Sequence, residues 1–257
     1  MKRILVPLIA SLLFPLLARA EPACPSLVIT GHPDYPPLAW ASQGRIVGAG
    51  AELVASIATQ LGVGKVESKD FGSWEKAQQA ARRGRADVIF GIFKTAKREK
   101  YLNYIDPPFM LDPIVVVVRK GEGFTFRNWE DLRGRRAVKN AGESYGDRFD
   151  AFMAKELTVV QADGVDKAFD ALLNKEADYL IIGLYPGRNE TRRLGLADRV
   201  EILPGELETA EGMYVAFSKK SKCYAALGSG FSAALKAAVD EGQVKALLDS
   251  AEKQLGQ

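Results

Sequence analysis

The 257-residue chain is 47% hydrophobic and 26% charged, enough apolar side chain for a sizeable core, which excludes a disordered protein. Its formal charge of +3 arises in the first twenty residues, which contain three basic residues and no acidic one. The rest of the chain carries 32 basic and 32 acidic residues, so charge gives no support to nucleic-acid binding, and we expect no such partner.

Residues 1–20 have the features of a secretory signal peptide. A basic start precedes an apolar stretch at 4–17, and Ala18-Arg19-Ala20 is a cleavage site of the A-x-A kind. An uncleaved anchor would need roughly 20 apolar residues, so we expect cleavage after Ala20 and a soluble protein in the periplasm. A lipoprotein acylated at Cys24 is a third alternative, but residues 21–23 lack the expected apolar residue.

Cys24 and Cys223 are the only cysteines, one near each end of the mature chain. In an oxidising compartment a disulfide is more common than a reactive thiol or a metal site, and only one intramolecular pairing is possible. We therefore expect this disulfide and no metal site. The bridge would place both chain ends in one domain and, with a loop of about 200 residues, would contribute about 4–5 kcal/mol at most.

Strand-like and helix-like patterns alternate after the leader. Residues 27–30 are a β-type run, residues 31–37 form a proline-rich loop, and apolar residues at 54, 57, 58 and 61 have the spacing of an amphipathic helix. Later, residues 113–118 are a β-branched run, residues 213–217 are another strand-like stretch, and residues 224–255 are helical in pattern. This alternation predicts an α/β fold with a largely parallel sheet.

One pattern occurs twice. A helix at 75–83 leads through an Ala-Asp pair into a strand ending at Gly91, and a helix at 166–173 leads in the same way to Gly183. The repeat has two explanations: any two αβ units look alike, or each unit belongs to a separate lobe. Ligands of open α/β sheets bind beyond the carboxyl ends of the strands, where both glycines would lie.

Together these elements resemble family 3 of the bacterial extracellular solute-binding proteins, the polar amino-acid-binding components of ABC importers. The resemblance covers essentially the whole mature chain and depends on the order of its segments: Tyr35-Pro36-Pro37, 47–54, Trp74, Gly91, 95–100, 104–109, 131–135 and 142–146. It implies a periplasmic-binding-protein-like fold of type II, with two α/β lobes joined by a double-crossover hinge. Lobe 1 would comprise residues 21–110 plus 212–257, and lobe 2 residues 111–211.

The resemblance also implies ligand contacts from both lobes. Arg98, in a Thr95-x-x-Arg spacing after Gly91, matches the family's carboxylate-binding arginine, and a guanidinium offers two parallel donors to a carboxylate. Its alternative is a solvated member of the basic run at 94–100. Gly142-Glu143-Ser144 resembles the lobe 2 turn whose backbone N–H groups and hydroxyl bind the same carboxylate.

Aromatic residues are candidates for contacting the ligand's side chain. Tyr35, Trp40 and Trp74 lie at or near the matching positions of lobe 1, and Tyr145 follows the turn in lobe 2. Core packing is the alternative for each of them. The only histidine, His32, lies where the family often has an acidic side chain near the ligand, but we expect it on the surface.

The sequence departs from the family at Gly183, where members that bind α-amino acids commonly have an aspartate for the ammonium group. Ala49 and Gly50 also replace the usual aromatic and acidic residues of the first helix. Three explanations stay open: another acid such as Glu143 binds the ammonium, the ligand has no standard α-amino group, or this lobe no longer binds as in a transporter component. We expect Asp178, which opens the second strand, to be structural.

The leading prediction is a monomeric periplasmic protein that captures a small carboxylate-bearing polar solute for an inner-membrane ABC permease, with no cofactor. One alternative is a periplasmic enzyme of the same fold, similar to cyclohexadienyl dehydratases, with Glu143, Glu211 and His32 as candidate acids or bases. No catalytic residue is assigned, because nothing in the sequence pairs these three. The other alternative is a solitary ligand-sensing module with a separate partner.

Overall fold

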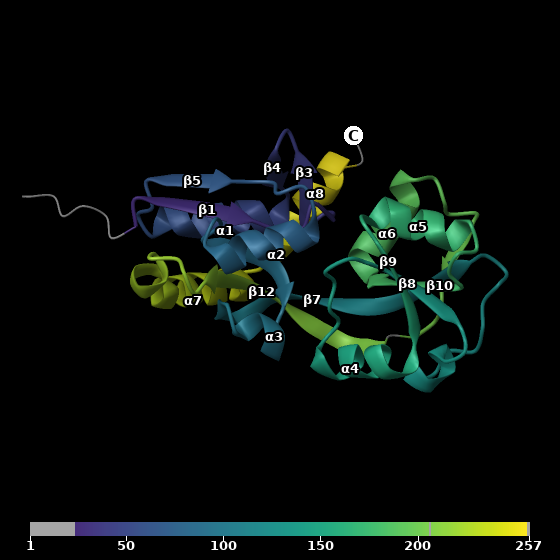
Figure 1. The fold of residues 1–257 in the computed structure, drawn as a ribbon. Coiled ribbons are helices and arrows are strands. Elements are labelled where there is room, and N and C mark those ends of the chain that lie inside the picture. The colour runs from purple at the N-terminus through teal and green to yellow at the C-terminus, as the bar shows by residue number, and fades with distance from the viewer. Residues whose placement is uncertain (1–23, 206, 256–257) are drawn as a thin grey trace, which may run out of the picture.

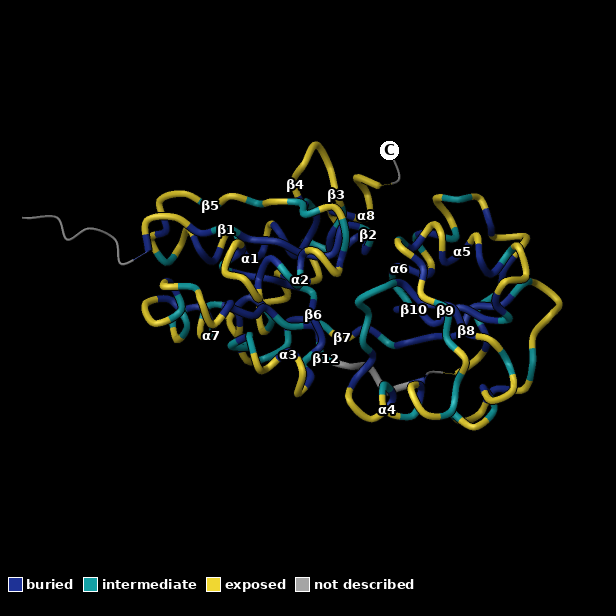
Figure 2. Tube along the Cα trace, viewed as in Figure 1, coloured by how far each residue is buried: buried dark blue, intermediate teal, exposed yellow. Residues whose placement is uncertain are grey.

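The computed structural model describes residues 24–205 and 207–255, so the predicted signal peptide lies outside the described residues. The chain forms two α/β lobes connected by two long strands (Figure 1). Buried segments run through the middle of each lobe, and most exposed segments are loops and outer helix faces (Figure 2). No described helix is both long and apolar enough to span a membrane.

Lobe 1 combines both ends of the described chain. Its elements are β1 (Ser26–Thr30), β2 (Asp34–Tyr35), β3 (Ala39–Ser42), β4 (Arg45–Val47), α1 (Ala49–Gln60), β5 (Lys65–Ser68), α2 (Trp74–Arg83), β6 (Val88–Phe93), α3 (Ala96–Glu99), α7 (Tyr224–Asp240) and α8 (Gln243–Leu255). In the sheet, β1 pairs in parallel with β5 and β6, and β2, β3 and β4 form a separate small sheet. The face of α1 predicted to be apolar contacts the core through Val54, Ile57 and Ala58.

Lobe 2 is built from the middle of the chain. Its elements are the short 3-10 helix Trp129–Leu132, β8 (Arg136–Asn140), α4 (Asp147–Glu156), β9 (Thr158–Ala162), α5 (Val165–Leu173), β10 (Tyr179–Gly183), α6 (Leu184–Arg193) and β11 (Val200–Ile202). β8 pairs in parallel with β9 and β10. The sheet packs against α5, and apolar residues of α5, β7, β8 and β10 form the core between them.

Two long antiparallel strands, β7 (Leu102–Arg119) and β12 (Glu208–Ser218), connect the lobes. β12 pairs with β6 in lobe 1, while β7 pairs with β10 and β11 in lobe 2. The chain therefore crosses to lobe 2 on β7 and returns on β12, as the predicted double crossover requires. The sheet is continuous and mixed rather than largely parallel, because the crossover strands and β11 pair in the antiparallel sense.

The repeated helix-Ala-Asp-strand pattern is one unit of each lobe, α2–β6 and α5–β10. In lobe 1 the Asp87 carboxylate accepts the Val28 N–H at 2.9 Å, and in lobe 2 the Asp178 carboxylate accepts the Arg136 N–H at 2.7 Å. Each aspartate thus fixes the start of its strand against a parallel neighbour. This confirms that Asp178 is structural and that the two units belong to different lobes.

Cys24 and Cys223 form the expected disulfide. Cys24 precedes β1, and Cys223 precedes α7, which lies in lobe 1 (Figure 1). The bridge therefore joins the first strand of lobe 1 to the helices that end the chain. It closes a sequence separation of 199 residues that contains all of lobe 2.

Candidate functional site

Arg98 lies on the short helix α3, directly after β6, on the side of lobe 1 that meets lobe 2. The Thr95 hydroxyl caps this helix by accepting the Arg98 N–H at 3.3 Å. Arg98 is only 4% exposed, so it is not a solvated member of the surrounding basic run, whose Lys97 and Lys100 are exposed. Burial separates Arg98 from its neighbours, and its contact with a ligand's carboxylate stays a prediction.

The Arg98 guanidinium reaches across the boundary between the lobes. Its Nε donates to Gln78 Oε1 at 3.1 Å, Nη1 donates to the Phe93 carbonyl at 3.1 Å, and Nη2 donates to the Gly142 carbonyl at 3.2 Å. Gln78 Nε2 donates to the same Gly142 carbonyl at 3.0 Å. These bonds use three of the five N–H groups of a guanidinium, so two donors of Arg98 have capacity for further acceptors.

A cleft of about 660 Å³ lies beside Arg98 between the lobes. Its lobe 1 wall includes Gln78, Thr95 and Arg98, and its lobe 2 wall includes Lys139 and Ser144. A small polar solute fits within this volume, and cationic side chains face it from both lobes.

The turn at residues 140–145 forms the lobe 2 wall of this cleft. Gly142 has a φ of +79°, and a Cβ there would lie 3.0 Å from Gln78 Nε2, so the close approach of the lobes favours glycine. Ser144 donates its hydroxyl hydrogen to the Asp150 carboxylate, which also accepts the Tyr145 N–H at 2.9 Å. Asp150 thus fixes the turn and uses one of the N–H groups expected to face an anion.

His32 is 3% exposed, so the expectation of a surface histidine is wrong. The loop after β1 folds into the boundary between the lobes, where Trp74 lies 5.0 Å from the imidazole, centroid to centroid. Nδ1 accepts the Asp34 N–H at 2.9 Å, so Nε2 carries the ring proton and lies 3.0 Å from Glu143 Oε1. His32 and Glu143 therefore pair across the lobe boundary.

The Glu143 carboxylate is surrounded by positive and donating groups. Burial works to raise its pKa, but the His32 hydrogen bond and the charges of Arg98 and Lys139 outweigh it, so the Glu143 pKa lies below its ordinary value. The structure thus pairs two of the three candidate acids and bases, which the sequence alone did not do, and a catalytic role for them stays an untested alternative. The third candidate, Glu211, has a side chain outside the described part of the structure.

Lys139 is a site residue that the sequence interpretation missed. It is 8% exposed at the end of β8, and its ammonium donates to the Glu143 carbonyl at 2.7 Å. Burial lowers the pKa of Lys139, while the negative charges of Glu143 and Asp150 act to raise it and only partly offset the burial. The sequence signal that could have indicated Lys139 was a single lysine after the apolar residues Ala137 and Val138 of a strand.

Asp112 is the second residue that was missed. It is fully buried on β7, and its Oδ2 accepts the Tyr35 hydroxyl at 2.6 Å. A Cβ at Gly183 would lie 2.1 Å from the Tyr35 hydroxyl and 2.4 Å from Asp112 Oδ2. The space that a side chain at position 183 would need is therefore filled by Tyr35 and Asp112. The signal in the sequence was a lone acid in the apolar segment 109–118.

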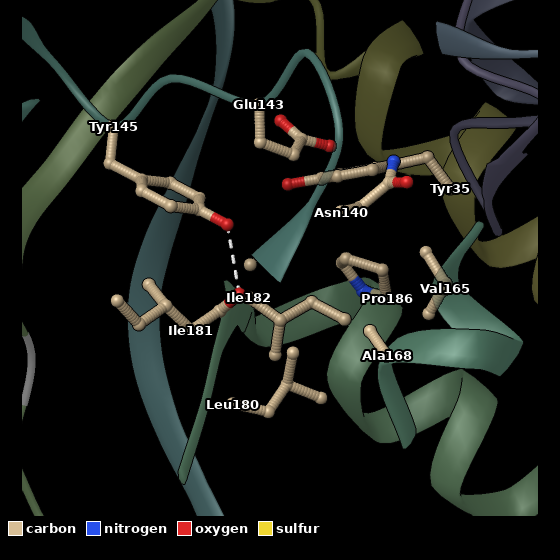
Figure 3. Close-up of a pocket in the computed structure, with 11 residues that line it drawn as sticks. Tyr35, Asn140, Glu143, Tyr145, Val165, Ala168, Leu180, Ile181, Ile182 and Pro186 are labelled. Atoms are coloured by element: carbon tan, nitrogen blue, oxygen red, sulfur yellow. Dashed lines mark hydrogen bonds between the residues drawn. The ribbon is translucent and has the colours of Figure 1, made fainter. Parts of the chain in front are cut away.

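The remaining predicted residues mostly pack within the protein. Tyr145 is 2% exposed and donates its hydroxyl to the Ile181 carbonyl at 2.8 Å (Figure 3). Trp74 is buried beside His32, and its indole N–H has no partner among the described residues. Gly91 has a φ of +68° at an irregularity in the β6–β12 pairing and lines neither of the two cavities described in this section. Ligand contact at all these positions stays a prediction.

The two lobes and the double crossover define the type II periplasmic-binding-protein-like fold, with a buried arginine at the lobe boundary. Bacterial extracellular solute-binding proteins, family 3, match residues 27–251, and the chain belongs to this family. The family is defined by solute binding, which confirms the prediction of a binding protein over an enzyme.

Solved structures of other binding proteins share the fold. An amino acid ABC transporter substrate-binding protein from Streptococcus pneumoniae bound to L-arginine is 21% identical with a TM-score of 0.73, covering 90% of this chain and 96% of its own. A histidine kinase sensor domain is 24% identical with a TM-score of 0.74, covering 89% and 96%. The GluR0 ligand-binding core from Nostoc punctiforme with L-glutamate is 21% identical with a TM-score of 0.70, covering 87% and 98%. The comparison with curated proteins found no match.

Proposed function

We propose that this protein captures a small carboxylate-bearing polar solute, an amino acid or a derivative, between its lobes in the periplasm and delivers it as a monomer to an inner-membrane ABC permease. The observation that carries the proposal is the buried Arg98, which meets lobe 2 at the Gly142 carbonyl beside a cleft of about 660 Å³. Family membership and the neighbours that bind arginine or glutamate support the ligand class.

Arg98 and Lys139 provide the positive charge for the ligand's carboxylate. A guanidinium stays charged when buried, and its remaining N–H groups can bind a carboxylate alongside the bonds to lobe 1. Lys139 faces the same cleft from lobe 2. A carboxylate that contacts both residues binds the closed arrangement better than an open one, and this difference in affinity favours closure.

The lobe boundaries that we propose are residues 21–110 plus 212–257 and residues 111–211. The backbone pairing of Leu111 with Gly212 and of Asp112 with Glu211 supports crossing points at these positions. Export by a signal peptide cleaved after Ala20 agrees with the extracellular character of the family.

The proposal is tested with residues 21–257 in a thermal-shift screen against the common L-amino acids and small carboxylates. A solute that binds only the native protein raises the melting temperature, and calorimetry then gives its affinity. Arg98→Ala should weaken binding about 10- to 150-fold, since a hydrogen bond to a charged group contributes about 1.5–3 kcal/mol. Arg83→Ala, which removes an exposed arginine of α2, is the matched control.

An unchanged affinity in Arg98→Ala contradicts the site, and a screen in which no solute binds contradicts the function. The role in import is separate from binding and needs its own measurement. Cells lacking the protein should take up the identified solute more slowly and recover with the wild-type gene. Normal uptake in cells without the protein would instead favour a solitary sensor.

A further inference from the structure

The strand register brings Asp112 to Gly183. β7 and β10 pair in the antiparallel sense with Gly183 opposite Ile114. Asp112 lies two residues before Ile114 on β7 and on the same face of the sheet. Its Oδ2 lies 2.4 Å from the position that a Cβ at residue 183 would take. The Asp112 carboxylate therefore occupies the space in which a side chain at the end of β10 would project.

Two carboxylates lie at this part of the lobe boundary, and their surroundings differ. Glu143 pairs with His32 and lies near Arg98 and Lys139. Asp112 accepts hydrogen bonds from the Tyr35 hydroxyl at 2.6 Å and the Tyr185 N–H at 3.4 Å, and no basic side chain among residues 24–205 and 207–255 forms an ion pair with it. A buried carboxylate without a cation is costly, so Asp112 rather than Glu143 has an unmet need for positive charge.

The ionisation of Asp112 reflects this need. Burial raises the Asp112 pKa to about 7, against the lowering effect of the Tyr35 hydroxyl and the Tyr185 and Leu184 N–H groups, while the charge of Glu143 raises it further. A cation placed beside Asp112 would favour the ionised carboxylate and lower this pKa.

Access to Asp112 depends on the lobes. Tyr35 lies on β2 of lobe 1, so its hydrogen bond to Asp112 crosses to the strand that enters lobe 2, and a movement of the lobes relative to one another would strain or break this bond. A cavity of about 10 Å³ next to Gly183, lined by Tyr35, Asn140 and Glu143 among others, has room for one group the size of a water molecule (Figure 3). An ammonium group has this size, whereas a guanidinium is larger and planar. Asp112 does not line this cavity but accepts a hydrogen bond from Tyr35, which does.

Glu143 interacts electrostatically with both Arg98 and Asp112, so the cation and the unpaired acid lie near one common side chain. We propose that Asp112 binds the primary ammonium group of the ligand, in exchange for the Tyr35 hydroxyl, and so makes the protein selective for amino acids over carboxylates without an amino group. This inference depends on the proposed function and specifies its ligand class.

The test compares amino acids with their desamino analogues. For each amino acid that binds in the screen, calorimetry measures the matched carboxylate, beginning with L-glutamate and glutarate, L-glutamine and glutaramate, and L-arginine and 5-guanidinopentanoate. Wild type should prefer the amino acid at least about tenfold, as expected for a charge-assisted hydrogen bond. Asp112→Asn, which keeps an oxygen acceptor for Tyr35, should reduce the preference to about threefold or less without weakening the analogue. Asp198→Asn, an exposed carboxylate of lobe 2, is the control.

The outcomes separate the two proposals. If the preference is unchanged in Asp112→Asn, or if wild type binds both members of each pair equally, the role of Asp112 is overturned while carboxylate binding stands. If only carboxylates without an amino group bind, the role of Asp112 is likewise overturned. If no probe binds, the proposed function fails as well.

A measurement on wild type alone keeps the inference testable if Asp112→Asn does not fold. Between pH 6 and pH 8 the affinity for the amino acid should rise as Asp112 ionises, since the pKa of its carboxyl is about 7, while the affinity for the desamino analogue should not rise. Parallel changes for both compounds would overturn the inference.

Discussion

Buried charge is compensated differently at two ends of the lobe boundary, one marked by Arg98 and the other by Asp112. At one end Arg98 donates to three oxygen atoms contributed by both lobes and keeps two further N–H donors. At the other end Asp112 is just as buried, but its donors are a hydroxyl and a backbone N–H, neither of them charged. Arg98 therefore stays positively charged, whereas the carboxyl group of Asp112 changes its charge near neutral pH.

The largest expected difference between Arg98 and Asp112 is in how the free energy of unfolding depends on pH. Because the Asp112 pKa is raised from 3.8 to about 7, the folded protein keeps a proton that the unfolded chain releases. Its contribution is thus fully present below about pH 4 and is lost as pH rises to about 7, with a slope of at most about 1.4 kcal/mol per pH unit. Urea titrations of wild type and Asp112→Asn between pH 4.5 and 8 should show this slope in wild type alone.

The pKa of Glu143 is shifted in the opposite direction from that of Asp112, so Glu143 serves as an internal comparison. Its pKa is lowered, so its contribution is present above about pH 4.5 and is lost as pH falls through the lower folded value. Removing Glu143 should therefore reduce the loss of stability in acid and, because the Glu143 charge raises the Asp112 pKa, move the slope from Asp112 to lower pH without abolishing it. Identical slopes in wild type and Asp112→Asn would show that Asp112 does not titrate in this range.

Arg98→Ala should have the next largest effect. It removes the guanidinium hydrogen bonds to the Phe93 and Gly142 carbonyls, which keep the Tyr104 hydroxyl and Gln78 Nε2 as donors, and a hydrogen bond to a charged group contributes about 1.5–3 kcal/mol. The free energy of unfolding, measured by urea denaturation, should fall by at least that amount, against little change for the exposed Arg83→Ala. Arg98→Lys, which keeps the charge but not the fork of donors, should recover only part of the loss.

Gly183→Ala tests the packing at the end marked by Asp112. The added methyl would overlap both Tyr35 and Asp112, and overpacking of this kind typically costs about 1–3 kcal/mol. Gly64 is a suitable control, because a Cβ there would meet only the Pro25 carbonyl at 3.3 Å. If the two alanine variants unfold at the same urea concentration, the region around Gly183 is more adaptable than its geometry indicates.

The smallest effect is expected for Tyr35→Phe. Loss of one hydrogen bond should lower the free energy of unfolding by about 0.5–1.5 kcal/mol and raise the Asp112 pKa further, since the Tyr35 hydroxyl lowers it. Tyr145→Phe removes another buried tyrosine hydroxyl, bonded to the Ile181 carbonyl, and should leave the pH profile unchanged. A matching shift of the profile in both variants would point to a general loosening of the core.

Local patterns in the sequence sufficed to predict the alternation of elements, the disulfide and the structural role of Asp178. Arg98 was singled out by the resemblance to the family, through the Thr95-x-x-Arg98 spacing, whereas the local basic run alone favoured a solvated side chain. Asp112 and His32 escaped prediction because residues distant in the chain surround them. The β7–β10 register places Asp112 beside Gly183, 71 residues later, and His32 is buried against Trp74 and Glu143, which are also distant in the sequence.

The Gly142 carbonyl, which accepts hydrogen bonds from both Arg98 and Gln78, bears on how fast a ligand would exchange. If Arg98 binds the ligand's carboxylate through its remaining N–H groups, as proposed, the peptide oxygen and the carboxylate share one guanidinium. The carbonyl stays bonded while the carboxylate departs, so the guanidinium does not lose all its acceptors at once. This lowers the barrier to release, and dissociation would be fast for the affinity, as delivery to a partner requires.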